Sequence, residues 1–579
     1  MIQQETLEKS QFSLIPESID ELRALVMSQQ KRMESLEAEE ENYRLENDIL
    51  RERVKKLLQQ LYGRKSEKNI LDDDSEQMFL FGANIEDDAE SALFAKLQAE
   101  CAGDDSDDTI TIPEHKRKKG RKPLPEHLPR VEVIHDLSEE AKKCQCGCEM
   151  SRIGEESSEK LEMLPPQFWV ARHVRYKYAC KHCEGLESTE SPVKLAPPPV
   201  QILPKSIATP SLLAHLFVSK FADALPFYRQ ESQFMRYGID LSRAVMCNWA
   251  FKIADKSEHL LELLRQELLS GPLISIDETT VQVLKEPGRS ADSKSYMWVF
   301  RGGGGGGGPA PPDKKIVLFR YSPSRSGEVV RQFIGNYRGY VQTDGYAGYD
   351  YLDAIEDIIH MGCWAHARRK FVEVARQHNN TNKKHKKKGG IGIGKCGHAI
   401  QAIAKLYGIE KKARRDNLSI EDLYQLRQDE AKPILDEFGD WLQDNRLKIP
   451  PTSPLGEAFN YAINQWPRLI NYLKSGIVPI DNNLTENAIR PFVVGRKNWL
   501  FSDQPRGAHA SALFYSLIET AKANGLEPYS YLLYLFDRLP YAATEEDYKI
   551  LLPLYVTAER LGEFRKEYWL KCDEEALKK

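Results

Sequence analysis

The chain has 579 residues, enough for several domains, and 41% of them are hydrophobic, which suffices for packed cores. The net charge of −5 hides strong segregation, because residues 71–110 carry thirteen acidic side chains and residues 116–122 carry six basic ones. Five of the ten cysteines fall within 144–183, which favours metal binding in a reducing compartment over a secreted disulfide scaffold. No signal segment and no apolar run of ~20 residues is present, so we expect a cytoplasmic protein with no membrane partner.

A charged helical pattern over 19–65 carries a seven-residue repeat in which nine of twelve seam positions are apolar, Val26 and Leu50 among them. Asn47 takes an a position, where a buried polar residue fixes register and favours dimers. An amphipathic helix docked on its own domain is the alternative. Because the flanking positions are so polar, we predict that residues 1–65 form a dimerisation coiled coil.

Residues 66–130 combine an acidic linker with a basic segment. The run 116–125 resembles an AT-hook, whose extended Gly-Arg-Lys-Pro core lies in a narrow minor groove where negative potential attracts Arg and Lys. A basic linker that contacts phosphates without specificity is an equally good interpretation, since short basic runs are weak motifs. Under either interpretation the candidate DNA contacts are Lys116, Arg117, Lys118, Lys119, Arg121 and Lys122.

Two cysteine clusters predict a small zinc-binding module over 131–194. Cys180 and Cys183 form a C-x-x-C pair, which suits half of a tetrahedral Zn²⁺ site. The first cluster is irregular, because it offers three thiols where two are expected. Cys144 and Cys146 are the preferred first pair, with Cys148 as the alternative ligand. Free thiols are the competing interpretation, but two clusters this close are uncommon by chance, so a structural Zn²⁺ is expected.

Residues 195–270 are predicted to be helical. Three helices are expected, at 211–221, 226–236 and 242–254, and Ser242 is a plausible N-cap of the third. The turn before that helix gives helix-turn-helix spacing, and Arg229 is the candidate DNA contact. An ordinary helical bundle is nearly as good an interpretation.

From residue 271 the pattern changes to strands. Strands are expected at 273–284, 296–301, 315–321 and 339–343, with a helix near 327–335 before the last of them. Three strands joined by hairpins, then a helix, then a strand match the order of a ribonuclease-H-like core. Its first part would be 271–371 and its second part 476–504, separated by a helical insertion over 372–475. Residues 505–579 would form a C-terminal helical element.

Three carboxylates carry the chemistry that this core predicts. Asp277 and Asp344 end apolar strands, and Glu486 lies on a downstream helix. Mg²⁺ prefers oxygen ligands, and two such ions can clamp the attacking and leaving oxygens of a phosphodiester. Asp277 would bridge the two ions, Asp344 would hold one and Glu486 the other. For any single Asp, a role in a turn or as a helix cap is commoner than a catalytic role. Glu278, which should point to the opposite strand face, and Asp481, an expected N-cap, are weaker candidates for the site.

Basic residues flank these carboxylates in the sequence. His366 and Lys370 share one helical face, and a contact with a phosphate or the scissile strand is as plausible as a structural role for the histidine. Arg490, Arg496 and Lys497 are expected to line the same groove and contact the DNA backbone.

Together these motifs resemble the DDE transposases of the insertion-sequence-66 group, from the zipper to the C-terminus. The most specific pieces are 362–371, 481–491 and Asp344-Gly345-Tyr346. The resemblance implies a multidomain α+β protein with an N-terminal coiled coil, a zinc module, a helix-turn-helix-like segment and a ribonuclease-H-like catalytic core with a helical insertion. It also implies Asp277, Asp344 and Glu486 as the triad and Mg²⁺ as cofactor, with Mn²⁺ able to substitute.

The resemblance further implies partners. These are the terminal inverted repeats of a bacterial mobile element, target DNA, a second copy or more of the chain, and accessory proteins encoded beside it. We therefore expect a transposase that cuts and transfers DNA strands in the bacterial cytoplasm, on the nucleoid when bound to DNA. A catalytically silent DNA-binding regulator of the same ends is the alternative, and a metal-dependent nuclease without strand transfer is a third reading. The intact triad argues against the regulator.

Overall fold

The computed structural model describes residues 27, 32–33, 167–179, 193–303, 314–382 and 394–577. The basic segment 116–122 and Cys144, Cys146, Cys148, Cys180 and Cys183 lie outside these ranges. Of the expected coiled coil, Met27, Arg32 and Met33 are described; all three are helical and exposed. The chain divides into two compact units, Cys101–Pro199 on the one hand and Met1–Glu100 with Val200–Lys579 on the other.

The described part of the smaller unit is an antiparallel hairpin. Its strands are β1 (Lys177–Ala179) and β2 (Val193–Leu195), paired from Lys177 opposite Leu195 to Ala179 opposite Val193. The Nε atom of Arg175 donates a hydrogen bond to the Ala196 carbonyl at 2.7 Å, which extends the hairpin by side-chain contact.

Three helices open the larger unit: α5 (Pro210–Phe221), α6 (Phe227–Arg236) and α7 (Arg243–Leu269). Ser242 is the N-cap of α7, as predicted, and accepts a hydrogen bond from the Val245 backbone. The turn before it contains Gly238 with φ of +73°, a conformation that glycine adopts without strain. Helix α7 continues well past the predicted end at 254, because Leu260, Leu263, Leu264 and Leu268 extend its buried face.

A five-stranded mixed sheet follows, with the order β5-β4-β3-β6-β7. The strands are β3 (Leu273–Gln282), β4 (Lys294–Gly302), β5 (Ile316–Ser322), β6 (Gly339–Gln342) and β7 (Ile358–Met361), and helix α8 (Glu328–Ile334) precedes β6. Strand β4 pairs antiparallel with both β3 and β5, whereas β6 and β7 run parallel to β3. The predicted strands and helix are confirmed, with ends shifted by up to two residues.

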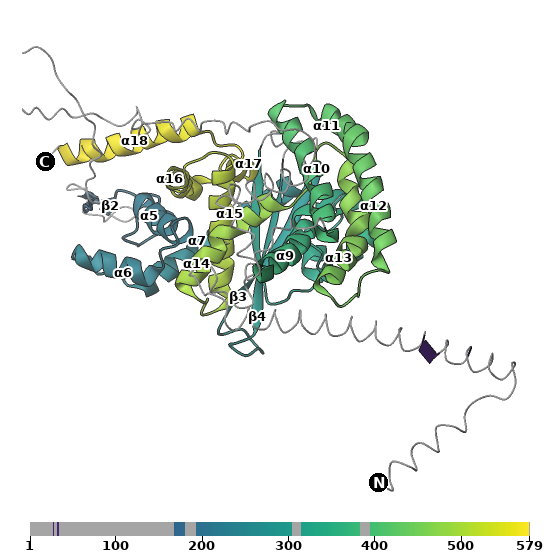
Figure 1. Ribbon diagram of the computed structural model, residues 1–579. Coiled ribbons are helices and arrows are strands. Elements are labelled where there is room, and N and C mark those ends of the chain that lie inside the picture. The colour runs from purple at the N-terminus through teal and green to yellow at the C-terminus, as the bar shows by residue number, and fades with distance from the viewer. Residues whose placement is uncertain are drawn as a thin grey trace, which may run out of the picture. The chain divides into compact units, whose positions relative to one another are not determined.

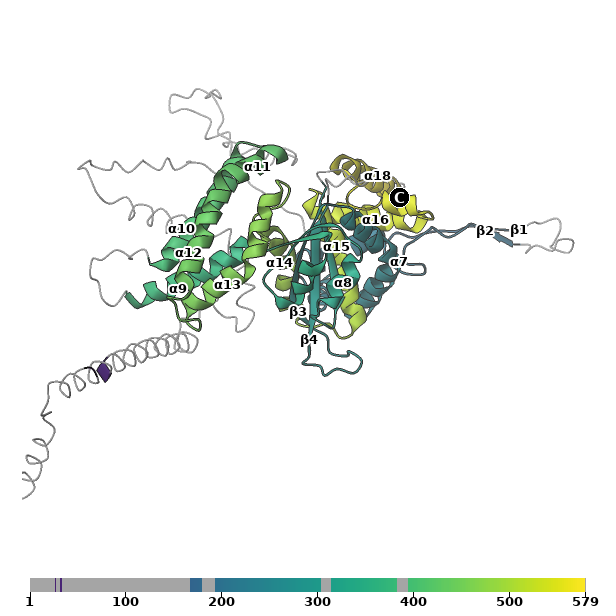
Figure 2. The same cartoon turned by 90° about the vertical axis from the view of Figure 1, so that its right-hand side faces the viewer.

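The sheet separates two hydrophobic cores. Ile274 and Val341, which pair across β3 and β6, belong to one core, while their neighbours Leu273 and Tyr340 pack against the other. Alternate residues of a strand point to opposite faces, so both faces of the sheet are covered. In two perpendicular views, helices α9–α13 group on the side of the sheet away from α7, α16 and α18 (Figure 1, Figure 2).

The second core belongs to the helical insertion. It is built from α9 (Trp364–Asn382), α10 (Lys395–Arg415), α11 (Ile420–Leu426), the π-helical η4 (Arg427–Ala431), α12 (Lys432–Arg446), α13 (Pro454–Leu469) and η5 (Ile470–Lys474). Arg427 is fully buried and pairs with Glu410 through two 2.8 Å hydrogen bonds. It also donates to the carbonyls of Tyr472, Ser475 and Val478, which fixes the segment leading back to the sheet.

The C-terminal helices cover the other core. They are α14 (Asn483–Trp499), α15 (Pro505–Ala523), α16 (Pro528–Arg538), α17 (Glu545–Lys549) and α18 (Ala558–Leu577). Helix α15 lies along the edge strand β5, where Ser516 and Thr520 accept hydrogen bonds from the backbone N–H groups of Phe319 and Val317. These hydroxyls satisfy backbone donors that an edge strand would otherwise leave open. Across the ranges that the structure describes, no helix is long and apolar enough to span a membrane.

Candidate functional site

Asp277 lies in the middle of β3 and not at the strand end that the sequence predicted, whereas Asp344 lies in the turn after β6, which runs parallel to β3. Strand β3 pairs with β6 from Leu273 opposite Tyr340 to Ser275 opposite Gln342, and each aspartate lies two residues beyond that last pair. Because β3 and β6 run parallel and in register, residues at equal distances beyond the last pair lie next to each other, and this brings the two carboxylates together. The Asp344 carboxylate accepts a hydrogen bond from the Tyr346 backbone at 2.9 Å, which holds the turn after β6.

Glu486 reaches the same edge from the first turn of α14, and Asn482 positions that helix. The Asn482 side chain donates to the Ile276 carbonyl at 3.1 Å, directly before Asp277 in β3. Its backbone N–H donates to the Cys363 sulfur at 3.3 Å. Asn482 therefore fastens the start of α14 both to the central strand and to the start of α9. Asn482 takes the N-cap position expected for Asp481, but the Asp481 carboxylate still accepts a hydrogen bond from the Asn483 backbone N–H at 3.2 Å, and a second one from the Tyr407 hydroxyl.

The electrostatics indicate that the three carboxylates share one site. Burial raises the pKa of Asp277 well above its usual range, and the negative charges of Glu278, Glu486 and Asp344 raise it further. Burial also raises the pKa of Glu486 to about 8 against the opposing charge of Arg369, and the negative charges of Asp481 and Asp344 raise it as well. Buried carboxylates that raise one another's pKa would be stabilised in their charged form by a bound cation.

Glu278 is adjacent to Asp277 but has partners of its own. Arg325 donates to it at 2.8 Å, and the Tyr349 hydroxyl donates to its other oxygen. Tyr349 belongs to the first core, on the sheet face opposite to that of Leu273. Strand alternation thus turns Glu278 away from Asp277, as the sequence predicted, and its carboxylate is already neutralised by a guanidinium.

A chain of polar contacts supports the turn that carries Asp344. The Thr343 hydroxyl and His360 Nε2 lie 2.8 Å apart, and His360 Nδ1 lies 2.7 Å from Asp353. Burial, aided by the charge of Arg468, lowers the pKa of His360 to about 4, so the ring is neutral at pH 7. The guanidinium of Arg468 binds Asp353 in turn. This chain fixes the end of β6 from the side of the helical insertion.

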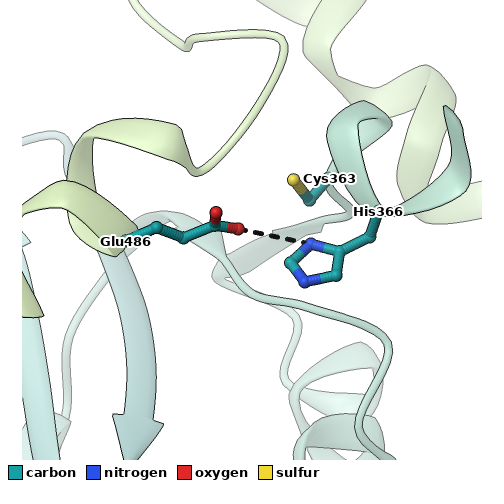
Figure 3. A group of neighbouring side chains, drawn as sticks. All are labelled: Cys363, His366 and Glu486. Atoms are coloured by element: carbon teal, nitrogen blue, oxygen red, sulfur yellow. Dashed lines mark ion pairs between the residues drawn. The ribbon is translucent and has the colours of Figure 1, made fainter. Parts of the chain in front are cut away.

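His366 lies beside Glu486, in the first turn of α9. Its Nδ1 atom is 3.6 Å from Glu486 Oε1, and the Cys363 sulfur belongs to the same cluster, in which one ligand atom of each residue lies within 4.8 Å of the others. Figure 3 shows Glu486 pointing from α14 towards these two residues of the neighbouring segment. Burial, with the charges of Arg369 and Lys370, lowers the pKa of His366 to about 3, so this ring is also neutral.

The expected DNA contacts fall into two groups. Arg229 and Lys497 are exposed, and Lys370 and Arg490 are half-buried, so all four are accessible on their helices. Arg496 has another role from the one expected, because it is buried and donates to the Thr279 and Thr280 hydroxyls of β3 at 3.1 and 2.8 Å. Its guanidinium packs α14 against the central strand, where a DNA phosphate could not reach it.

Cys363 and Asn482 are the site residues that sequence reasoning missed. The C-x-x-H spacing of Cys363 and His366, i and i+3 at a helix start, was the available signal for the thiol. Asn482 gave no such signal, because its partners Ile276 and Cys363 are far away in the chain.

Comparison with known proteins gives one consistent family. A family model described as "Transposase IS66 family" matches residues 205–510, and "IS66 C-terminal element" matches 516–554. "Transposase C of IS166 homeodomain" matches 49–133 and "zinc-finger binding domain of transposase IS66" matches 141–184.

Full-length relatives and one solved structure also match. The uncharacterized protein y4jD of Sinorhizobium fredii is 32% identical, over 76% of this chain and 83% of that protein. The uncharacterized protein y4qI of the same organism is 28% identical, over 95% of this chain and 99% of that protein. A Drosophila P element transposase strand transfer complex aligns at a TM-score of 0.29 and 11% identity, over 54% of this chain and 92% of that one, too low to carry an argument.

Proposed function

The chain belongs to the IS66 family of transposases, and we propose that it cuts and transfers DNA strands at the site formed by Asp277, Asp344 and Glu486. The observation that carries this proposal is the convergence of three acidic residues from β3, the turn after β6, and α14 at one sheet edge. Each residue comes from a different part of the sequence, and its negative charge makes ionisation of its neighbours less favourable.

The donor set fits Mg²⁺, or Mn²⁺ in its place. Neither oxygen of Glu486 has a hydrogen-bond partner, although the residue is 1% exposed, and an ionised carboxylate in such a place is costly without a cation. Asp277, Asp344 and Glu486 would hold two ions, with Asp277 between them. Bound Mg²⁺ supplies a nucleophile of lowered pKa and neutralises charge on the phosphate.

The chain's other residues have separate tasks in this proposal. Asn482 and Arg496 hold α14 on β3, and His360 holds the end of β6, so that the carboxylates keep their spacing. His366 is neutral, so it could form a hydrogen bond with a DNA strand without adding positive charge to the site. Lys370, Arg490 and Lys497 are placed to contact the DNA backbone, since phosphate contacts position a duplex for such a site.

The wider assembly is also part of the proposal. The five-stranded sheet would be a ribonuclease-H-like core, which its strand order supports. The zinc-finger match at 141–184 supports a structural Zn²⁺ held by Cys144, Cys146, Cys180 and Cys183. Residues 1–65 would join copies of the chain on the terminal inverted repeats, in the bacterial cytoplasm and with accessory proteins of the same element.

The deciding experiment is strand cleavage and joining on DNA that carries the element's own terminal repeats. It compares Mg²⁺ with EDTA, and the wild type with Asp277→Asn and with Asp436→Asn, an exposed carboxylate of α12 that serves as the matched control. We expect metal-dependent cutting that Asp277→Asn abolishes and Asp436→Asn retains. Binding to the ends without cutting in any condition, accessory proteins included, would instead make the chain a silent DNA-binding regulator.

A further inference from the structure

Cys363, His366 and Glu486 form a cluster whose chemistry differs from that of the three carboxylates. It combines a thiol, an imidazole and a carboxylate, whereas Mg²⁺ sites use oxygen ligands alone. Thiolate and imidazole together select softer divalent ions, above all Zn²⁺. Cys363 and Glu486 are each 1% exposed, and His366 is largely covered.

Three polar atoms of the cluster lack hydrogen bonds, and the nearest cation of the described chain, the Arg369 guanidinium, is 3.9 Å from Glu486 Oε2. His366 Nδ1 and both oxygens of Glu486 are buried without a hydrogen-bond partner. Buried polar groups are normally satisfied, and an ion missing from the coordinates is one physical reason for an exception. That three such atoms face one another makes an ion between them the simplest account.

The spacing agrees with tetrahedral coordination. Nitrogen and oxygen ligands at about 2.0–2.1 Å from a tetrahedral ion lie about 3.3 Å from each other. His366 Nδ1 and Glu486 Oε1 are 3.6 Å apart, and no pair in the cluster exceeds 4.8 Å. A contraction of at most about 1.5 Å, within the reach of side-chain rotation, would close the site.

Burial and the negative charges of Glu486 and Asp481 raise the pKa of the Cys363 thiol well above its usual range, so a thiolate forms here only with a cation beside it, and two local features would then support it. The Asn482 backbone N–H donates to Cys363 Sγ at 3.3 Å, and outer hydrogen bonds of this kind orient metal ligands. Cys363 directly precedes helix α9, whose N-terminus favours negative charge. The Asn482 hydrogen bond and the helix N-terminus both favour the thiolate form of Cys363. A neutral thiol would require neither of them.

We propose that Cys363, His366 and Glu486 bind a Zn²⁺-like divalent cation, next to the three-carboxylate site and sharing Glu486 with it. Three protein ligands leave a fourth position open. An ion held here withdraws Glu486 from Mg²⁺, so Zn²⁺ inhibits strand cleavage. This inhibition rests on the proposed function, whereas the binding does not.

The test measures the Zn²⁺ content of the full-length protein after exposure to Zn²⁺ and removal of the unbound ion. The wild type is compared with Cys363→Ser, His366→Ala and the matched control Cys396→Ser in α10. We expect the first two variants to hold one equivalent less than the wild type and the control to hold the same amount. Zinc bound by the 141–184 module remains in all four proteins and cancels in the comparison.

Equal zinc content in all four proteins would overturn the proposal. If Cys363→Ser unfolds, which circular dichroism reports, His366→Ala decides alone, because it leaves the buried sulfur in place.

Cleavage in Mg²⁺ is then measured with and without added Zn²⁺. We expect at least a tenfold loss in the wild type and a smaller loss in Cys363→Ser; equal losses would refute inhibition through this site. A wild type that does not cut at all contradicts the proposed function, while the zinc content still decides the site.

Discussion

Replacing Glu486 by glutamine should stabilise the metal-free protein, although the proposed function makes Glu486 essential. In the folded chain the pKa of Glu486 is raised from 4.5 to about 8 by burial. Between these two values the folded state keeps a proton that the unfolded state has released, so stability falls as pH rises. Glutamine keeps the shape of the side chain and has no proton to lose.

The size of the effect follows from the pKa values. The gap from 4.5 to about 8, at about 1.4 kcal/mol for each pKa unit, sets an upper limit of about 5 kcal/mol at pH 8. Relaxation of the site and entry of water lower such penalties, so we expect about 2 kcal/mol. For the roughly 380 residues that the structure describes, a difference of about 2 kcal/mol corresponds to roughly 2–3 °C in the thermal midpoint.

The assay is thermal unfolding of wild type and Glu486→Gln in EDTA, from pH 5 to pH 8. The midpoints should nearly coincide at pH 5 and separate as pH rises, with the variant more stable. Added Mg²⁺ should raise the wild-type midpoint and not that of the variant, since only the carboxylate gains from the ion. A variant that is equally or less stable than the wild type at pH 8 in EDTA would refute the assignment of a buried carboxylate whose burial outweighs the charge of Arg369.

Four further substitutions test the supports of the site and of the helical insertion. Asn482→Ala should lower cleavage about tenfold or more while the fold is retained, because α14 loses its hydrogen bond to β3; unchanged cleavage rates would contradict this. Arg496→Ala should lower the free energy of unfolding in urea by about 2–3 kcal/mol without changing the salt dependence of DNA binding. Lys497→Ala should leave stability unchanged and reduce the slope of DNA affinity against salt concentration by about 1. The reverse pattern would show that Arg496, and not Lys497, contacts DNA. Arg427→Met should destabilise the protein by about 3–5 kcal/mol by leaving Glu410 buried and unpaired, and a variant as stable as wild type would count against that pairing.

The strands and the positions of Asp277 and Asp344 could be predicted because their signals are local. Apolar alternation marks each strand, and parallel strands end at one edge whatever the rest of the chain does. The N-cap Ser242 was predictable for the same reason, since a cap depends on the next three residues. The end of α7 was also in the sequence, in the leucines that continue its period to Leu268.

The remaining features depend on partners that are distant in the sequence. Arg496 looks like a solvated charge at the end of a helix, and only the fold places it on Thr279 and Thr280 of β3. Cys363 looks like a small core residue until α14 brings Glu486 beside it. The expected coiled coil, basic segment and zinc ligands fall largely outside the described ranges and stay predictions.

The helical insertion leaves and re-enters the sheet at nearly the same place. The Trp364 backbone at its start donates to the Ile480 carbonyl at its end, and Asn482 donates to Cys363 across the same junction. Two ends that meet in this way let an inserted lobe lengthen, shorten or be exchanged during evolution without altering the geometry where it joins. The lobe can therefore diverge in sequence while the proposed three-carboxylate site keeps its geometry.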